Sequence, residues 1–384
     1  MDKNILIIYG GNSTEHDVSI ITALQIFKKY KIEKSKVWLV YIDRQNDWYI
    51  GESLSSFTFY RKPDFSRLKK VRLLAGLSDL YFEKKNGKLK NLFPVDFVVN
   101  CCHGDVGESG DVTSLLEMCK IPTSTGDSAS LKLAMDKYFT KLISLAQDIP
   151  TVDFFVFTRN EWITHRGKIV EQAQQFGFPV VVKPSRQGSS VGVSLVSSMQ
   201  EFEHGVNLAF EFDDRIIIER AITSKREFNC CLIKKDGRVL ASSIEEPMAN
   251  GVIISFKDKY MGGKNSKTLK NGCEISRLTG SLMEGAERKI PASIPAKLKN
   301  EIIRHSKAIY STLDMCGIVR VDFIYDNDAE RLYLGEVNSI PGSLGFYFWG
   351  ELNILDIIYQ SGKKYWTEKF TRAKSTPQAR IFDC

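Results

Sequence analysis

Two strand-like segments near the C-terminus carry the residues that point most directly to chemistry. Residues 318–325 read Ile-Val-Arg-Val-Asp-Phe-Ile-Tyr, and residues 332–342 read Leu-Tyr-Leu-Gly-Glu-Val-Asn-Ser-Ile-Pro-Gly. Because strand side chains alternate between two faces, we expect Asp322, Glu336 and Asn338 on one face. Carboxylate and amide oxygens are ligands that suit a magnesium ion bridging ATP phosphates. The spacing therefore predicts a metal site at these three residues.

Arg320 stands two residues before Asp322 and is expected on the same face. A fixed guanidinium there could meet phosphoryl charge. The alternative is an ordinary hairpin with a solvated polar face. The strands are otherwise strongly apolar, and a buried carboxylate without a partner is costly, which favours the functional interpretation.

A second segment, residues 179–196, reads Pro-Val-Val-Val-Lys-Pro-Ser-Arg-Gln-Gly-Ser-Ser-Val-Gly-Val-Ser-Leu-Val. It predicts two strands around a glycine-serine loop that could fold over a triphosphate, since Gly188 and Gly192 permit close backbone approach. The spacing does not match a Walker loop. An ordinary flexible turn is the alternative, but Lys183 in an apolar strand needs an anionic partner, which favours phosphate binding.

The elements around these segments predict an α/β protein. Ile5 to Tyr9, the Gly10-Gly11 turn and the helical pattern from Val18 to Tyr30 are Rossmann-like. Further predicted elements are strands at 36–42, 95–101, 215–219 and 228–234, a helical stretch at 127–146, and an amphipathic helix at 298–313. Residues 45–94 are interpreted as an insertion of peripheral strands and loops, and the last twenty or so residues as a polar surface tail.

Length and composition limit the function classes. A chain of 384 residues is expected to hold two or three domains. Its net charge of +7 is spread along the chain, so anionic small molecules are plausible ligands and nucleic acid is not implied. The eight cysteines show no zinc-site spacing. No signal peptide or apolar run long enough for a membrane is evident, so we expect a cytoplasmic protein.

Together these motifs resemble the D-alanine–D-alanine ligase family of the ATP-grasp superfamily. Residues 10–19, Gly-Gly-Asn-Ser-Thr-Glu-His-Asp-Val-Ser, are similar to the N-terminal signature, and residues 103–110, His-Gly-Asp-Val-Gly-Glu-Ser-Gly, to the next. Further matches are Met-Asp-Lys at 135–137, Ile-Ile-Ile-Glu-Arg at 216–220, Arg-Glu-Phe at 226–228 and Phe-Lys-Asp-Lys-Tyr at 256–260. Each match is weak alone, but together they are specific.

The resemblance implies an ATP-grasp fold with three domains. The expected bounds are a Rossmann-like N-terminal substrate domain at 1–125, a central subdomain at 126–220 and a C-terminal domain at 221–384. The nucleotide would lie between the central and C-terminal α+β domains. The resemblance also implies ATP with two Mg²⁺ or Mn²⁺ ions, small amino-acid substrates, and a homodimer without nucleic-acid or membrane partners.

The resemblance assigns roles residue by residue. Glu15 would hold the ammonium of the first D-alanine and be oriented by Ser189 and Tyr260, with Arg320 and the backbone N–H of Gly342 as oxyanion donors. The expected substrate-binding residues are His103, Glu108, Lys259 and Tyr347. The expected nucleotide-binding residues are Lys137, Lys183, Ser190, Glu219 and Glu227. Residues 256–270 would form a lid that keeps water from an acyl phosphate.

Several histidines and glutamates have a purely structural alternative. His16 and His103 could be satisfied loop histidines, and Glu219 and Glu227 could be solvated carboxylates at strand ends. His165, His204 and His305 are interpreted as structural.

The chain also departs from the family pattern. The family's serine that binds the carboxylate of the second D-alanine is expected five residues after Gly342, where this chain has Tyr347. The first hypothesis is D-alanyl-D-alanine synthesis for peptidoglycan, because the Lys259-Tyr260 pair resembles the family members that accept an amine. Tyr347 motivates the second hypothesis, a related ligase with a different second amino acid or hydroxy acid. The third is a non-catalytic nucleotide-binding regulator. A phenol can still donate a hydrogen bond, although it is far larger than a serine hydroxyl.

Overall fold

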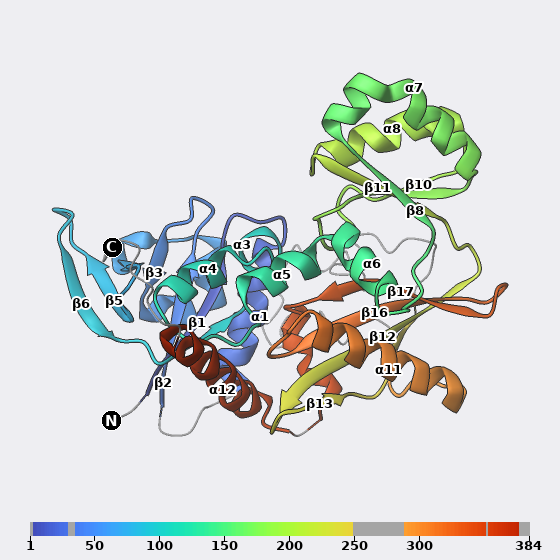
Figure 1. The fold of residues 1–384 in the computed structure, drawn as a ribbon. Helices are drawn as coiled ribbons and strands as arrows, with labels where there is room; N and C mark the ends of the chain where they lie inside the picture. The colour runs from blue at the N-terminus through green and yellow to red at the C-terminus, as the bar shows by residue number, and fades with distance from the viewer. Residues whose placement is uncertain (1–2, 30–34, 249–287, 351, 376–384) are drawn as a thin grey trace, which may run out of the picture.

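The computed structural model describes residues 3–29, 35–248, 288–350 and 352–375. Three sheets, each with its own helices, dominate these residues (Figure 1). The order of the elements along the chain is a mixed sheet, two linking helices, a small antiparallel sheet and a second antiparallel sheet. None of the helices in these ranges is both long and apolar enough to cross a membrane.

The first sheet has strand order β6-β5-β4-β3-β2-β1-β7. Its strands are β1 (Lys3–Gly10), β2 (Ser35–Ile42), β3 (Trp48–Ile50), β4 (Lys69–Leu73), β5 (Asp79–Glu83), β6 (Leu89–Pro94) and β7 (Phe97–Asn100). β1 pairs in parallel with β2 and β7, as the Rossmann-like prediction requires. The 45–94 insertion extends this sheet as an antiparallel meander, together with η1 (Glu52–Ser55), α2 (Phe57–Arg61) and η2 (Phe65–Arg67).

Both faces of β1 are buried, which explains its unbroken apolar run. Ile5 and Ile7 pack with α1 (His16–Lys29) and with residues near the C-terminus. Leu6 and Ile8 point the other way, into a core with residues of α4 (Asp111–Met118). The turn after β1 requires glycine, since a Cβ at Gly10 would lie 2.1 Å from the Ile42 carbonyl oxygen.

The second sheet is antiparallel, with order β10-β9-β11-β8, and α7 and α8 cover one face of it (Figure 1). Its elements are β8 (Phe154–Thr158), α7 (Arg159–Phe176), β9 (Val180–Pro184), β10 (Ser194–Val196), α8 (Met199–Phe210) and β11 (Arg215–Arg220). Val182 and Ile218 point into the helix-covered core. By alternation, Lys183 and Glu219 lie on the opposite face.

The third sheet has order β13-β12-β16-β17. Its elements are β12 (Lys225–Lys235), β13 (Arg238–Ala241), α11 (Ala296–Thr312), β16 (Val319–Asp326) and β17 (Arg331–Asn338), beside a two-stranded ribbon of β14 (Glu246–Pro247) and β15 (Arg288–Lys289). Val321 and Phe323 pack against Ile302 and Ile309 of α11. Arg320 and Asp322 therefore lie on the face away from that helix.

The helical stretch predicted at 127–146 is two helices, α5 (Ser128–Met135) and α6 (Lys137–Leu145). They divide at Asp136, whose carboxylate accepts a hydrogen bond from the Tyr138 backbone N–H and caps α6. Asp136 also accepts from Ser185 Oγ at 2.6 Å and Arg215 Nη1 at 2.9 Å. Both helices pack on β17.

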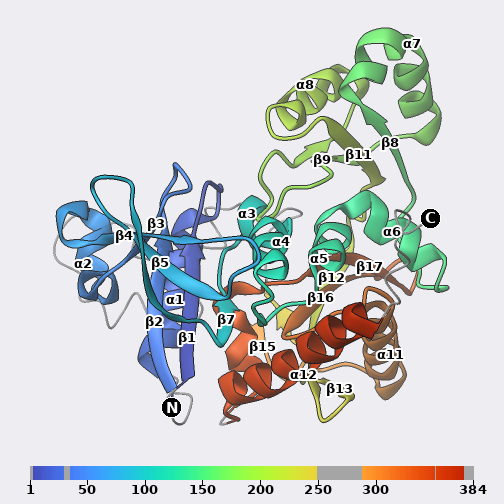
Figure 2. The same ribbon diagram turned by 60° about the vertical axis from the view of Figure 1, so that its left-hand side comes forward.

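The prediction of a polar tail is wrong for the described part of the C-terminus. Residues Ile354–Ser375 form α12, which packs against β12 and shares a core with β1 and β7 of the first sheet. Figure 2 shows this helix in red, low in the view. Trp366 is fully buried, and its indole N–H donates to the carbonyl oxygens of Thr123 and Thr125 at 3.0 and 3.2 Å. The prediction failed because most residues around Trp366 are polar or charged and lie on the outer surface of the helix. Such a sequence does not indicate that one large side chain is buried.

Replacing Trp366 by alanine should lower the free energy of unfolding by about 3 to 5 kcal/mol, because it opens a cavity and leaves two carbonyls unpaired. Chemical denaturation checks this. Ile163→Ala is a suitable control, since Ile163 is 72% exposed and its removal should change stability by less than about 0.5 kcal/mol. Equal stability of Trp366→Ala and the control would mean that α12 does not anchor the fold.

Candidate functional site

The glycine-serine loop of the second sheet contacts the start of α1. Ser189 Oγ donates a hydrogen bond to Glu15 Oε1, joining residues 174 positions apart. Ser189 and Ser190 both have left-handed backbone conformations, with φ of 50° and 60°. A Cβ at Gly188 would lie 2.9 Å from Glu15 Oε2, so glycine permits this close approach. The predicted Glu15–Ser189 contact is therefore present in the structure.

His103 lies two residues before α3 (Asp105–Glu108), and Glu108 is the last residue of that helix. His103 Nε2 lies 2.9 Å from Thr22 Oγ1, and burial lowers the pKa of His103 to about 4. Glu108 accepts hydrogen bonds from the backbone N–H groups of Gly104 at 2.9 Å and Ile340 at 3.4 Å. Burial, followed by the charge of Glu15, raises the pKa of Glu108 to about 8. A neutral imidazole and a neutral carboxyl group therefore stand here at pH 7.

The contacts of His16 fit the structural interpretation, in which its ring only supports the loop. Its ring is buried, with Nδ1 2.6 Å from the Gly11 carbonyl oxygen and Nε2 3.1 Å from the Tyr41 hydroxyl. Burial lowers its pKa. These contacts fix the glycine turn that presents Glu15.

A buried charge cluster lies on the inner face of the second sheet. Glu219 Oε2 accepts from Lys183 Nζ at 2.6 Å, while Lys141 Nζ lies 3.2 Å from Oε1. Burial alone raises the pKa of Glu219, but the charges of Lys141 and then Lys183 lower it to about 2. Burial lowers the pKa of Lys141. Glu219 is therefore the anionic partner of Lys183 in the structure.

Lys141 is a site residue that the sequence analysis missed. Its side chain is 1% exposed and belongs to α6. A signal existed, because Lys141 follows Lys137 by four residues and therefore shares its helix face. Lys137 Nζ donates to the Gln187 carbonyl oxygen at 2.5 Å and lies 3.9 Å from Glu336 Oε2. Lys137 thus lies between the glycine-serine loop and the third sheet.

The third sheet brings the predicted metal ligands together. Asp322 stands directly opposite Glu336, and Arg320 opposite Asn338, with a bulge just beyond Asp322. Arg320 binds both oxygens of Asp322 at 2.7 Å, and Asn338 Nδ2 donates to Oδ2 at 3.0 Å. The four side chains share the face turned away from α11, as the alternation predicted.

The donor chemistry of this face fits a magnesium ion. Asp322 and Glu336 supply carboxylate oxygens from adjacent strands, and the amide of Asn338 offers one more oxygen. Within residues 3–29, 35–248, 288–350 and 352–375, no three His, Cys, Asp or Glu side chains gather in a metal-binding group. Asp322, Glu336 and Asn338 stay a predicted ligand set, and an ion that also binds phosphate needs only one or two protein carboxylates.

The segment after β17 turns sharply over the site. η4 (Gly342–Phe348) begins with three left-handed residues after Gly342, namely Ser343, Leu344 and Gly345. Ser343 Oγ donates to Gln25 Oε1 at 2.6 Å, and the Ser343 N–H donates to Thr22 Oγ1 at 3.2 Å. Ser343 therefore ties the third sheet to α1.

Tyr347 lies at the end of this turn and packs into a charged cluster. Its hydroxyl donates to Glu245 Oε2 at 3.3 Å, and the Arg288 guanidinium lies 4.7 Å from its ring centre. Glu245 and Arg288 are further residues that the sequence analysis missed, because both lie in polar sequence without a strand pattern. Glu227, predicted for the ribose, is paired with Lys225 Nζ at 2.6 Å.

Two predicted residues, Lys259 and Tyr260, lie outside the described residues, together with the proposed lid at 256–270.

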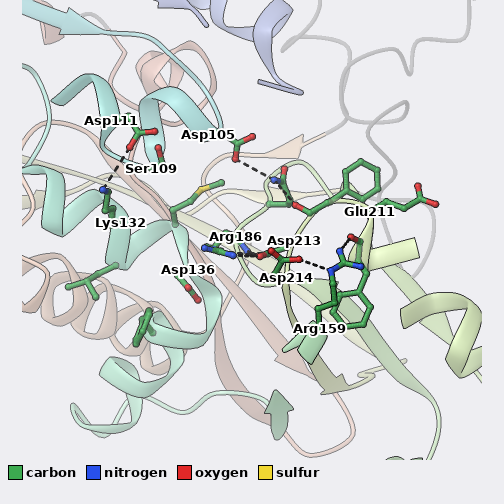
Figure 3. A pocket seen from close by; sticks show the side chains of 16 residues that line it. Asp105, Ser109, Asp111, Lys132, Asp136, Arg159, Arg186, Glu211, Asp213 and Asp214 are labelled. Atoms are coloured by element: carbon green, nitrogen blue, oxygen red, sulfur yellow. Dashed lines mark hydrogen bonds and ion pairs between the residues drawn. The ribbon is translucent and has the colours of Figure 1, made fainter. Parts of the chain in front are cut away.

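A cavity lies beside the glycine-serine loop, between α5, α6 and the second sheet (Figure 3). Arg186 points toward Asp213 and pairs with it, while Gln187 Nε2 donates to Asp105 Oδ1 at 3.3 Å. None of the predicted site residues lines this cavity. The loop thus contributes Arg186 and Gln187 to the cavity, and Ser189 to the contact with Glu15.

Two family models together match most of the chain. A family model described as "D-ala D-ala ligase N-terminus" matches residues 4–125, and "D-ala D-ala ligase C-terminus" matches residues 143–277 and 280–349. A D-alanine–D-alanine ligase of Thermosipho melanesiensis is 33% identical over 353 residues, covering 90% of this chain and 88% of that protein. One from Thermoanaerobacter sp. (strain X514) is 30% identical, covering 95% and 94%.

Solved structures are similar over nearly the whole chain. A D-Ala:D-Ser ligase from Enterococcus faecalis has a TM-score of 0.73 and 25% identity, covering 95% of this chain and 100% of that chain. The D-alanine-D-alanine ligase from Helicobacter pylori has a TM-score of 0.72 and 25% identity, covering 98% and 100%. These likenesses agree with the ATP-grasp prediction.

Glu108→Gln should become more stable relative to wild type as the pH rises from about 5 to 8. The folded state raises the pKa of Glu108 from 4.5 to about 8, so ionisation costs stability between these values. Glutamine cannot ionise and escapes that loss. Melting temperatures of both proteins across this range measure the difference, which should stay constant if Glu108 titrates normally.

Proposed function

The chain belongs to the D-alanine–D-alanine ligase family, and on that premise we propose that it joins two D-alanine molecules at the expense of ATP. The products are D-alanyl-D-alanine, ADP and phosphate, for peptidoglycan synthesis in the cytoplasm. The observation that supports this most is the convergence of three sheets on one site. Ser189 of the second sheet's glycine-serine loop contacts Glu15, which follows the first sheet's β1. Lys137 contacts the same loop at Gln187 and lies 3.9 Å from Glu336 of the third sheet.

The first chemical step activates a carboxylate. A carboxylate is a poor electrophile, so an oxygen of the first D-alanine attacks the γ-phosphorus of ATP, and ADP leaves. Phosphoryl transfer depends on positioning and charge neutralisation. Lys137 and Lys183 supply positive charge from α6 and β9. Glu15, held by Ser189, binds the ammonium of this substrate.

Magnesium would be held by Asp322, Glu336 and Asn338, where it neutralises phosphate charge. The directly opposite positions of Asp322 and Glu336 support this assignment. Arg320, on the same strand, donates hydrogen bonds to both oxygens of Asp322 and so holds the carboxylate in place. A second ion and a homodimeric assembly remain predictions.

The second step forms the peptide bond. The amine of the second D-alanine attacks the acyl phosphate carbon, and phosphate leaves as the tetrahedral intermediate collapses. Arg320 and the Gly342 backbone N–H are the proposed donors to the developing oxyanion. The Arg320 side chain is 17% exposed and is held by both oxygens of Asp322, which supports that role, because preorganised charge acts most strongly where little water reaches it.

Glu219 is proposed to exchange partners when ATP binds. In this form it holds Lys183, and Lys141 holds its other oxygen. Phosphate can draw Lys183 away while Lys141 keeps Glu219 ionised, leaving a carboxylate oxygen for the adenine amino group. Ser190 and Glu227 remain proposed contacts to phosphate and ribose.

Wild-type protein incubated with ATP, Mg²⁺ and D-alanine should release ADP and D-alanyl-D-alanine in equal amounts. Glu336→Gln should reduce turnover by at least about a hundredfold while leaving the melting temperature nearly unchanged, because one carboxylate of the metal site is lost. Coupled ADP release and mass spectrometry of the dipeptide measure both.

Asp328→Asn is the matched control, since Asp328 is exposed on the turn that joins the same two strands. It should retain wild-type turnover. Activity of Glu336→Gln within about tenfold of wild type would contradict the metal assignment. ADP release without any dipeptide would contradict the proposed ligase activity itself.

A further inference from the structure

The Glu245–Arg288–Tyr347 cluster lies next to the proposed reaction site and has no role in the mechanism above. Arg288 Nη1 is 3.2 Å from Glu245 Oε1. Oε2 of the same carboxylate accepts from the Tyr347 hydroxyl at 3.3 Å and from Asn229 Nδ2 at 2.9 Å. The Glu245 side chain is only 4% exposed, so these contacts replace its water.

The cluster holds its guanidinium in a fixed orientation. Arg288 lies over the ring of Tyr347, and that ring stacks on Phe348 at 4.5 Å between centres. A charged carboxylate at one edge and an aromatic face below restrict an otherwise flexible side chain. The Arg288 side chain is 18% exposed, more than Glu245, so the guanidinium is the more accessible end of the pair.

The cluster adjoins the reaction site. Asn229 on β12 stands directly opposite Asp322, so its side chain shares the face of the predicted metal ligands. Asn229 donates to Glu245, which pairs with Arg288, so this chain of contacts joins the guanidinium to the strand beside the predicted metal ligands.

The hydrogen bonds of the cluster decide which residue can bind an anion. A phenol has one O–H, and Tyr347 donates it to Glu245. The Tyr347 hydroxyl therefore cannot also donate to a substrate carboxylate. A guanidinium has five N–H groups in a planar fork and can hold more than one carboxylate at once.

We propose that Arg288 binds the carboxylate of the second substrate, in place of the serine hydroxyl that the family motif has at position 347. This proposal rests on the proposed ligase activity. Tyr347 and Glu245 are positioning residues, which hold the guanidinium against the acceptor. The acceptor is a D-amino acid with a free α-carboxylate, and its amine is directed toward the acyl phosphate near Arg320.

Competition between two acceptors tests this assignment directly. D-alaninamide cannot be activated, since it has no carboxylate to phosphorylate, so it enters only as the second substrate. Reactions with ATP, D-alanine and D-alaninamide yield two dipeptides, whose ratio mass spectrometry measures. Wild type should favour D-alanine strongly. Arg288→Gln should shift the ratio toward the amide product by about tenfold to a hundredfold, as loss of a charge-assisted hydrogen bond predicts.

Two further variants separate binding from packing. Arg226→Gln removes a neighbouring arginine that pairs with Glu246 at 2.7 Å, and it should leave the product ratio unchanged. Tyr347→Phe keeps the ring under the guanidinium and should shift the ratio by less than about threefold. Thermal unfolding of each variant identifies any that fail to fold.

Three outcomes would overturn the proposal. They are an unchanged product ratio in folded Arg288→Gln, an equal shift in Arg226→Gln, and no preference for D-alanine over its amide in wild type. The last needs no variant and keeps the test decisive if Arg288→Gln does not fold. Absence of any dipeptide from wild type would instead contradict the ligase activity.

Discussion

Charged side chains buried where three sheets meet must find partners of opposite charge, and this constraint organises the site. The effective cost of moving one such ion into a protein interior is still several kcal/mol after the protein relaxes around it. Lys183 and Lys141 therefore share Glu219, and Arg320 grips Asp322. Under the proposed function, ATP phosphate replaces Glu219 as the partner of Lys183, and magnesium joins Arg320 as a partner of Asp322. Each buried side chain therefore has a partner of opposite charge before and after the ligands bind.

The apolar cores explain how such an exchange can be accommodated. Ile5 and Ile7 of the first sheet share a core with Cys231, Ile318 and other residues of the third sheet. The second sheet instead has a core of its own, formed with α7 and α8. Its described links to the rest of the site are polar: the glycine-serine loop contacts Glu15 and Asp105, Lys141 pairs with Glu219, and Arg215 donates to Asp136. Displacing that sheet would break these contacts but would not open the core that it forms with α7 and α8.

Strand periodicity predicted most of the site, because alternation alone assigns a face. Arg320, Asp322, Glu336 and Asn338 lie together for that reason. Periodicity cannot name partners across the fold, so Lys141 was missed although it shares a helix face with Lys137. It also failed at Trp366, where one apolar anchor lies in a polar helix. Partner identity and single anchors are properties of the tertiary structure.

Tyr347 is held in place by several residues of this chain at once. A Cβ at Gly345 would lie 2.8 Å from Cys231 Sγ, so glycine lets the left-handed turn of η4 press closely against β12. That turn places the Tyr347 ring beneath the Arg288 guanidinium, and the Glu245 carboxylate contacts both side chains. Serine at 347 alone would remove the ring from beneath the guanidinium and a donor from a nearly buried carboxylate. A serine at position 347 would therefore not recreate the serine-based carboxylate site of the family motif. Arg288 and Glu245 would remain paired, but the aromatic ring that they pack around would be gone.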